Sequence, residues 1–233
     1  MASLTNRLLS QHSDLFQSAT QHNFLIKAGE GTLSADTLIA WLVQDEHYQH
    51  AYVPFIGHLM VKLTLPSSIK IGGQNNSLPH RILDVLIGAA ANLRREESFY
   101  SEVIKDYGLS EHAHEAPPNS ATQPYIDLFD STGRNGSLLE GMTLLWATET
   151  VYLRAWQFAG SKAEESSGSG DAASKAVREK FIPNWTNDEF VQFVETLGEL
   201  VDELYAETKA DEEKCVAVWK KVLELETGFW PDV

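Results

Sequence analysis

The stretch that decides the fold is Ala40-Trp41-Leu42-Val43-Gln44-Asp45-Glu46-His47-Tyr48-Gln49-His50-Ala51-Tyr52. It contains no Gly or Pro, so it can form a continuous helix, in which Trp41, Asp45, Tyr48 and Tyr52 share one face. Aromatic residues at this spacing are most often core, and an Asp among them most often reaches solvent or a neighbouring side chain. We call a helical face that combines a carboxylate with aromatic residues a stripe. Two similar stripes occur later in the chain, and together the three favour a common pocket over a purely structural role.

The second stripe is Trp146-Ala147-Thr148-Glu149-Thr150-Val151-Tyr152, where Glu149 and Tyr152 are three residues apart in a mostly apolar helix. Burial would raise the pKa of a carboxylate there, as a general acid or base near neutral pH requires. A purely structural Glu bonded to a Tyr or Arg is equally compatible with this pattern. The third stripe is Glu226-Thr227-Gly228-Phe229-Trp230, whose aromatic character predicts that the end of the chain docks on the core.

Outside these stripes the chain also has helical rather than strand periodicity, which predicts an all-α single domain of seven or eight helices over residues 1–233. Ser34 is placed to cap the helix that carries the first stripe, and Pro54 predicts a kink in that helix or a break. Loops are predicted at 65–79, 108–124 and 161–174 from their Pro, Gly and Ser content. Further helices are predicted at 4–21, 80–107, 189–208 and 211–227, and capping boxes at 137–140 and 186–189.

The composition excludes several classes of function. The 33 acidic and 18 basic residues give a formal charge of −15, which repels phosphate backbones and anionic lipid, so we expect no nucleic-acid or membrane partner. No apolar run reaches the roughly 18 residues of a membrane helix, and the first residues lack a signal-peptide core. One cysteine, Cys215, cannot form an internal disulfide. These features predict a cytoplasmic protein.

Two regions resemble the TenA family of thiamin-salvage enzymes. Gly31-Thr32-Leu33 followed by Gln44-Asp45 and Tyr48 is similar to the family's pattern near the start of the chain, and Glu226-x-x-Phe229-Trp230 is similar to its ending. The resemblance implies the heme-oxygenase-like helical bundle. It also implies that Asp45 holds the amino and ring-nitrogen edge of an aminopyrimidine beside Tyr48, that Tyr125 is a pocket tyrosine, and that Glu226 handles a proton.

Thr148 departs from the thiaminase branch of that family, which carries a nucleophilic Cys four residues before the Tyr that corresponds to Tyr152. The pattern Trp146-Ala147-x-Glu149-x-x-Tyr152 resembles instead the branch that lacks this Cys, and Asn184-Trp185-Thr186 with Phe190 is also similar to it. The resemblance implies hydrolysis of aminomethyl- or formylaminomethyl-pyrimidine, with no cofactor and no metal, by a protein that assembles as a homo-oligomer.

We therefore expect Glu149 to act as general base on water and Glu226 to shuttle a proton, with a pyrimidine held by Asp45 and an aromatic slot. The predicted slot consists of Trp41, Tyr48, Tyr125 and Tyr152. One alternative is a di-iron oxidase of the same fold, in which Glu46 and His50 supply half a metal site. The other is a binding protein that keeps the pocket without chemistry.

Overall fold

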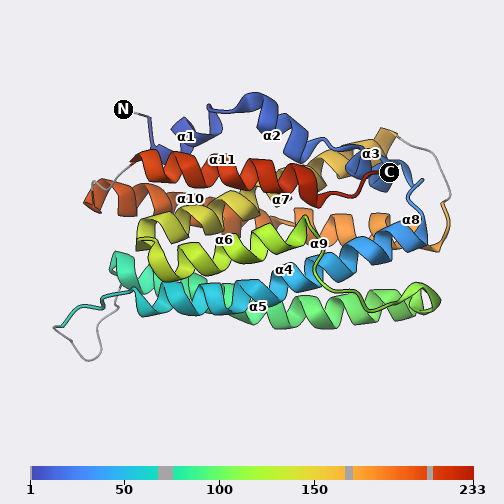
Figure 1. Ribbon diagram of the computed structural model, residues 1–233, viewed down its shortest axis with the longest axis horizontal. Helices are drawn as coiled ribbons and strands as arrows, with labels where there is room; N and C mark the ends of the chain where they lie inside the picture. Colours follow the sequence, from blue (N-terminus) through green and yellow to red (C-terminus); the bar gives the residue numbers. More distant parts are fainter. Residues whose placement is uncertain (1, 68–75, 166–169, 209–211) are drawn as a thin grey trace.

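Helices account for the regular structure of the chain. The computed structural model describes residues 2–67, 76–165, 170–208 and 212–233, and within these ranges it contains helices and no strand, so the all-α prediction is confirmed (Figure 1). The elements are α1 (Leu4–Leu9), α2 (Ser13–Thr20), α3 (Asn23–Glu30), α4 (Ala35–Val61), α5 (Leu78–Asp106), η1 (Ser110–His112), α6 (Thr122–Asn135), α7 (Leu138–Glu165), α8 (Ala172–Ala176), η2 (Val177–Phe181), α9 (Ile182–Thr186), α10 (Asp188–Thr208) and α11 (Glu212–Phe229).

The long helices α4, α5, α7, α10 and α11 run along the long axis of the molecule (Figure 1). Helix α4 packs against α5 and α6, while α7 lies in the middle and packs against α3, α10 and α11. One cluster of buried apolar side chains extends from Leu4 to Trp230 and joins all of these helices. Within the described ranges, no helix combines the length and apolar character needed to cross a membrane.

Two of the predicted helix starts are confirmed. Ser34 Oγ accepts a hydrogen bond from the Thr37 backbone N–H at the start of α4. Ser137 and Glu140 form the reciprocal bonds of a capping box at the start of α7. Helix α4 then runs through Pro54 without ending.

The capping box predicted at 186–189 is wrong by one residue. Asn187 caps α10, because its Oδ1 accepts from the Phe190 backbone N–H at 2.8 Å. The Thr186 hydroxyl is not available for that role, since it donates to the Ile182 carbonyl one turn back in α9.

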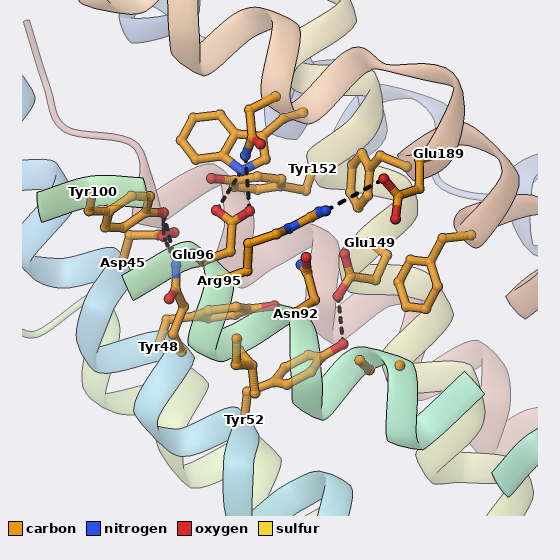
Figure 2. Close-up of a pocket in the computed structure, with 18 residues that line it drawn as sticks. Asp45, Tyr48, Tyr52, Asn92, Arg95, Glu96, Tyr100, Glu149, Tyr152 and Glu189 are labelled. Atoms are coloured by element: carbon orange, nitrogen blue, oxygen red, sulfur yellow. Dashed lines mark hydrogen bonds and ion pairs between the residues drawn. The ribbon is translucent and has the colours of Figure 1, made fainter. Parts of the chain in front are cut away.

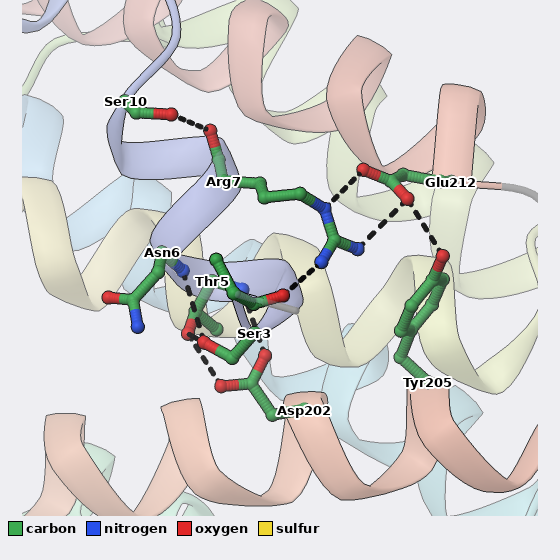
Figure 3. A network of polar contacts seen from close by, with 9 residues as sticks. Ser3, Thr5, Asn6, Arg7, Ser10, Asp202, Tyr205 and Glu212 are labelled. Carbon is green, nitrogen blue, oxygen red and sulfur yellow. Dashed lines mark hydrogen bonds and ion pairs between the residues drawn. The ribbon is translucent and has the colours of Figure 1, made fainter.

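The helix predicted over 4–21 is in fact two helices. His12 adopts a left-handed backbone conformation, with φ of 58°, and separates α1 from α2. Asp202 of α10 accepts from both the backbone and the hydroxyl of Thr5, and Arg7 forms a two-pronged ion pair with Glu212 of α11 (Figure 3). These contacts hold α1 against α10 and α11. With short helices such as α1 and α2 counted, the described residues form eleven α-helices, more than the seven or eight predicted.

Parts of the predicted loops are helical. Leu78 and Pro79 open α5, as the fixed φ of proline favours in a first turn. Residues 110–112 form η1 and α6 begins at Thr122, both inside the predicted loop 108–124. Helix α7 continues to Glu165 and Asp171 caps α8, so the loop predicted at 161–174 is shorter than expected; 68–75 and 166–169 lie outside the described residues.

The end of the chain docks on the core as predicted. Trp230 is 2% exposed, and its indole N–H donates to the Ala19 carbonyl of α2 at 2.7 Å. Its ring stacks against Phe24 and Trp41. This contact joins α11 to α3 and α4 and fixes the position of Glu226 one turn earlier.

Candidate active site

A cavity of about 220 Å³ lies between α4, α5, α7, α9 and α10 (Figure 2). Its walls combine carboxylates with aromatic rings. The acidic residues are Asp45, Glu96, Glu149 and Glu189, and the aromatic residues are Tyr48, Tyr52, Tyr100, Tyr152, Trp185, Phe190 and Phe193. A space of this size and character fits one small flat ligand.

Asp45 lies deep in the wall and is 3% exposed. Its Oδ2 accepts hydrogen bonds from the Tyr100 hydroxyl and from Gln49 Nε2, the latter at 3.0 Å. Burial raises the pKa of Asp45 to about 7, although both hydrogen bonds favour the ionised form. The carboxyl can therefore exchange its proton near neutral pH.

Glu149 faces the same cavity from α7. Its Oε1 accepts from the Tyr52 hydroxyl at 2.6 Å, so the first and second sequence stripes meet through this hydrogen bond. Burial raises the pKa of Glu149 to about 7, and the Tyr52 hydrogen bond opposes that rise. A carboxylate with this pKa, in a cavity that can admit water, meets the requirements for a general base.

Glu96 of α5 is a third buried acid in the cavity, and our sequence analysis missed it. It is 7% exposed, and its two oxygens accept from Asn184 Nδ2 at 2.9 Å and Trp185 Nε1 at 3.2 Å. Burial raises its pKa above the ordinary value. The available signal was its place on the apolar face of α5, where Ala89, Leu93 and Tyr100 are also buried.

Two polar atoms of the wall are buried and have no hydrogen-bond partner among the described residues. They are the Gln49 Oε1 acceptor and the Tyr152 hydroxyl. Unsatisfied buried groups are uncommon because each costs about 1–3 kcal/mol. Their position in a cavity wall is consistent with partners supplied by a ligand.

The structure brings together four of the predicted site residues and leaves three outside the cavity wall. Asp45, Tyr48, Glu149 and Tyr152 line the cavity. Trp41, Tyr125 and Glu226 are not part of the lining. Trp41 is instead buried in an aromatic cluster, where it contacts Phe24, Trp156, Trp185 and Trp230.

Glu226 lies behind the cavity and is 4% exposed. Its Oε2 accepts from the Tyr125 hydroxyl at 2.5 Å, while its Oε1 is buried with no partner among the described residues. Burial raises the pKa of Glu226 to about 8, and the negative charges of Asp45 and Glu149 contribute to the rise. The Tyr48 ring meets Tyr125 edge to face at 5.2 Å and belongs to the cavity wall, so Tyr48 connects Glu226 to the cavity.

Thr148 does not resemble an activated nucleophile. Its side chain is buried, and its hydroxyl donates to the carbonyls of Leu144 and Leu145 in its own helix, at 3.2 and 3.0 Å. Such bonds occupy the proton that a general base would have to remove. Cys215 is buried on α11 and is not among the residues that line the cavity.

Glu46 and His50 lie on the exposed side of α4. His50 Nε2 is 3.7 Å from Glu97 Oε1, and the described residues contain no group of three or more His, Cys, Asp or Glu that could hold a metal ion. The second half of the di-iron site is therefore not found among them.

The chain matches the TENA/THI-4/PQQC family over residues 9–233. It belongs to this family. Membership confirms the resemblance inferred from the two ends of the sequence. The match also covers the part of the chain between the Asp45 motif and the Glu226 motif.

Two curated relatives of this TenA-family chain are similar over nearly all of it. A Fusarium pseudograminearum protein named as a probable transcription factor is 33% identical over 98% of this chain and 52% of its own length, so the chain spans about half of that relative. A Glycine max protein named as a probable bifunctional TENA-E protein is 26% identical, covering 97% of this chain and 91% of its own.

Solved structures of TenA homologues have the same fold. The chain is similar to a TenA homologue from Pyrococcus furiosus, with a TM-score of 0.77 and 22% identity over 97% of this chain and 98% of that one. It is also similar to a structure described as a putative TenA-like thiaminase from Sulfolobus solfataricus, with a TM-score of 0.70 and 14% identity over 99% and 95%. The expected heme-oxygenase-like helical fold is therefore confirmed.

Proposed function

We propose that this protein hydrolyses aminomethyl- or formylaminomethyl-pyrimidine, breakdown products of thiamin, to hydroxymethylpyrimidine. The observation that carries the proposal is the position of Glu149, whose carboxylate faces the same small cavity as Asp45 while Thr148 beside it is bonded to the backbone. Family membership and the TENA-E name of the Glycine max relative support the same substrate class.

In this proposal Asp45 and Gln49 bind the donor edge of the pyrimidine, and the tyrosines around them hold the ring. Asp45 has raised pKa and remaining acceptor capacity, and Gln49 Oε1 has no partner among the described residues, so both suit a ring that carries an amino group. Tyr48 and Tyr152 lie on either side of this position and supply flat apolar surface (Figure 2).

Glu149 then removes a proton from water as the water attacks the methylene carbon. The carbon–oxygen bond forms, the carbon–nitrogen bond breaks, and the nitrogen leaves with the bonding electron pair and a proton. Glu226 does not contact the ligand in this scheme and is a positioning residue. It accepts the hydrogen bond of Tyr125, whose ring supports Tyr48 in the cavity wall.

The test is turnover of both pyrimidines by the wild-type protein and by Glu149→Gln, with Thr150→Val as the matched control one residue away. Loss of a general base lowers rates about 10²- to 10⁴-fold. We expect that loss in Glu149→Gln and a change below about threefold in Thr150→Val, since Thr150 does not line the cavity and its hydroxyl has no side-chain partner among the described residues. Equal rates in wild type and Glu149→Gln would remove Glu149 from the mechanism. Binding of a pyrimidine without product would favour a non-catalytic binding protein.

A further inference from the structure

Glu96 is a buried carboxylate of the cavity to which no role has been given above. Figure 2 places it between Asp45 and Glu149, with its carboxylate next to Tyr152. Of the two acids that raise the pKa of Glu149 by their charge, Glu96 has the larger effect and Asp45 the smaller. Glu96 is therefore the acid in the middle of the cavity, within electrostatic reach of both of the others.

The surroundings of Glu96 fix the carboxylate in place without neutralising it. Asn184 and Trp185 each donate one hydrogen bond, one to each oxygen. Both residues are uncharged, and both come from α9, which directly follows the π-helical turn η2. A π-helical turn changes the direction in which the following side chains point and often occurs near functional sites. Each carboxylate oxygen keeps capacity for a further donor.

The nearby charges leave room for a cation. Arg95 is the basic residue in the described lining, and its charge lowers the pKa of Glu96, against the larger effect of burial. Its side chain lies at the exposed rim, donates no hydrogen bond to Glu96 and pairs with Glu189 at 3.5 Å. The interior of the cavity thus holds Asp45, Glu96 and Glu149 with neutral hydrogen-bond donors only. A ligand that brings a positive charge into this space would gain a strong, charge-assisted hydrogen bond.

We propose that Glu96 is the residue that binds the protonated amine of an aminomethyl-pyrimidine and so selects the amine substrate over the neutral alcohol product. The inference rests on the proposed function, because it assumes a pyrimidine in this cavity. An alkylamine is protonated near neutral pH, as the lysine side chain is. Held as an ammonium group by Glu96, the nitrogen already carries the proton with which it leaves.

The reaction balances with this assignment. Water loses one proton to Glu149 and its oxygen bonds to the methylene carbon, while the carbon–nitrogen bond breaks and its electron pair leaves with nitrogen as ammonia. The product carries a hydroxyl in place of the ammonium group, so its charge-assisted bond to Glu96 is lost. Weak binding of the product then favours its release.

The test measures dissociation constants by calorimetry for aminomethyl-pyrimidine and hydroxymethyl-pyrimidine, in the Glu149→Gln background that prevents turnover. We expect this background to bind the amine at least about tenfold more tightly than the alcohol. Adding Glu96→Gln should reduce the preference to about threefold or less. Adding Glu97→Gln is the matched control. Glu97 is the next residue on α5 and does not line the cavity, and its substitution removes the same charge as Glu96→Gln. It should leave the preference within about twofold.

A preference that is unchanged by Glu96→Gln in a protein with unaltered thermal unfolding overturns the inference while leaving the proposed function intact. So does a Glu149→Gln background that binds both pyrimidines equally. If the wild-type protein binds none of aminomethyl-, formylaminomethyl- and hydroxymethyl-pyrimidine, the proposed function itself is refuted, and the Glu96 assignment with it. If Glu96→Gln does not fold, Glu96→Asp keeps the charge but shortens the side chain, and an amine preference equal to that of the background refutes the assignment.

Discussion

Tyr52→Phe should move the acidic limb of the pH–rate profile to higher pH. The Tyr52 hydroxyl donates to Glu149 Oε1 at 2.6 Å and lowers the pKa of Glu149, which burial has raised to about 7. A hydrogen bond to a charged group contributes roughly 1.5–3 kcal/mol, and one pKa unit corresponds to about 1.4 kcal/mol. Water that enters the space of the lost hydroxyl would restore part of this, so we expect a shift of about one pH unit.

The assay is kcat/KM for aminomethyl-pyrimidine from pH 5.5 to 9.5, which reports the ionisation of the free enzyme. A base must be deprotonated to act, so the wild-type rate should rise through about pH 7. The Tyr52→Phe rate should rise through about pH 8, which makes the variant about tenfold slower at pH 6 and nearly equal above pH 9. Phenylalanine preserves the ring contacts with Phe55 and Phe129.

Tyr205→Phe is the matched control for this experiment. Tyr205 also donates to a carboxylate, Glu212 Oε2, at 2.7 Å, but this pair lies at the junction of α1, α10 and α11 and not in the cavity (Figure 3). Its profile should coincide with that of the wild type. A Tyr52→Phe profile that does not move, or moves to lower pH, would show that Glu149 is not the titrating base.

Three further predictions concern the nucleophile, the pH dependence of stability and the packing. Thr148→Cys should add no burst of covalent intermediate, because the side chain at this position lies outside the cavity lining; a pyrimidine adduct detected by mass spectrometry would contradict this. Burial raises the pKa of Glu226 from 4.5 to about 8, so its stabilising contribution is complete below pH 4.5 and is lost as the pH rises to about 8. Thermal unfolding midpoints should fall over that range, and should fall less in Glu226→Gln; parallel curves would refute the burial argument. Gly29→Ala should destabilise the protein by roughly 1–3 kcal/mol in denaturant unfolding, because its Cβ would lie 2.2 Å from the Ala159 carbonyl oxygen. Gly57→Ala is the control: its Cβ would meet no atom of another part of the protein within 4 Å, so the variant should be neutral or slightly stabilised.

Sequence periodicity was sufficient to predict which side chains of one helix act together. Asp45 and Tyr48 share a face of α4, and Glu149 and Tyr152 share a face of α7, because positions three or four residues apart lie above one another on a helix. The same rule applies to Glu96 and Tyr100 on α5, and it could have identified Glu96 as an acid on an apolar face. The fold class followed from the same periodicity together with the two family motifs.

The distances between helices could not be predicted in this way. Glu226 and Tyr125 are on buried faces as expected, yet they contact each other and do not line the cavity. Tyr48 lies between this pair and the cavity. Whether a buried acid faces a cavity or a neighbouring ring depends on how the helices pack, which the spacing within one helix does not determine. The N-cap of α10 could not be chosen from the sequence either, because Thr186 and Asn187 are both residue types that suit an N-cap. In the structure the Thr186 hydroxyl bonds to the preceding helix α9, and Asn187 caps α10.

The hydrogen-bond donors around the buried acids explain why burial keeps the pKa of each acid above its ordinary value. Each acid is bonded to neutral donors: Tyr100 and Gln49 for Asp45, Tyr52 for Glu149, Asn184 and Trp185 for Glu96, and Tyr125 for Glu226. An Arg or Lys in any of these positions would hold its partner ionised and lower its pKa by one to three units. Neutral donors compensate only part of the desolvation cost, so burial prevails and the pKa values of Asp45 and Glu149 stay near 7. The same choice of donors leaves the interior of the cavity, with Asp45, Glu96 and Glu149, without a fixed positive charge, so a cationic ligand would favour the ionised form of these three carboxylates.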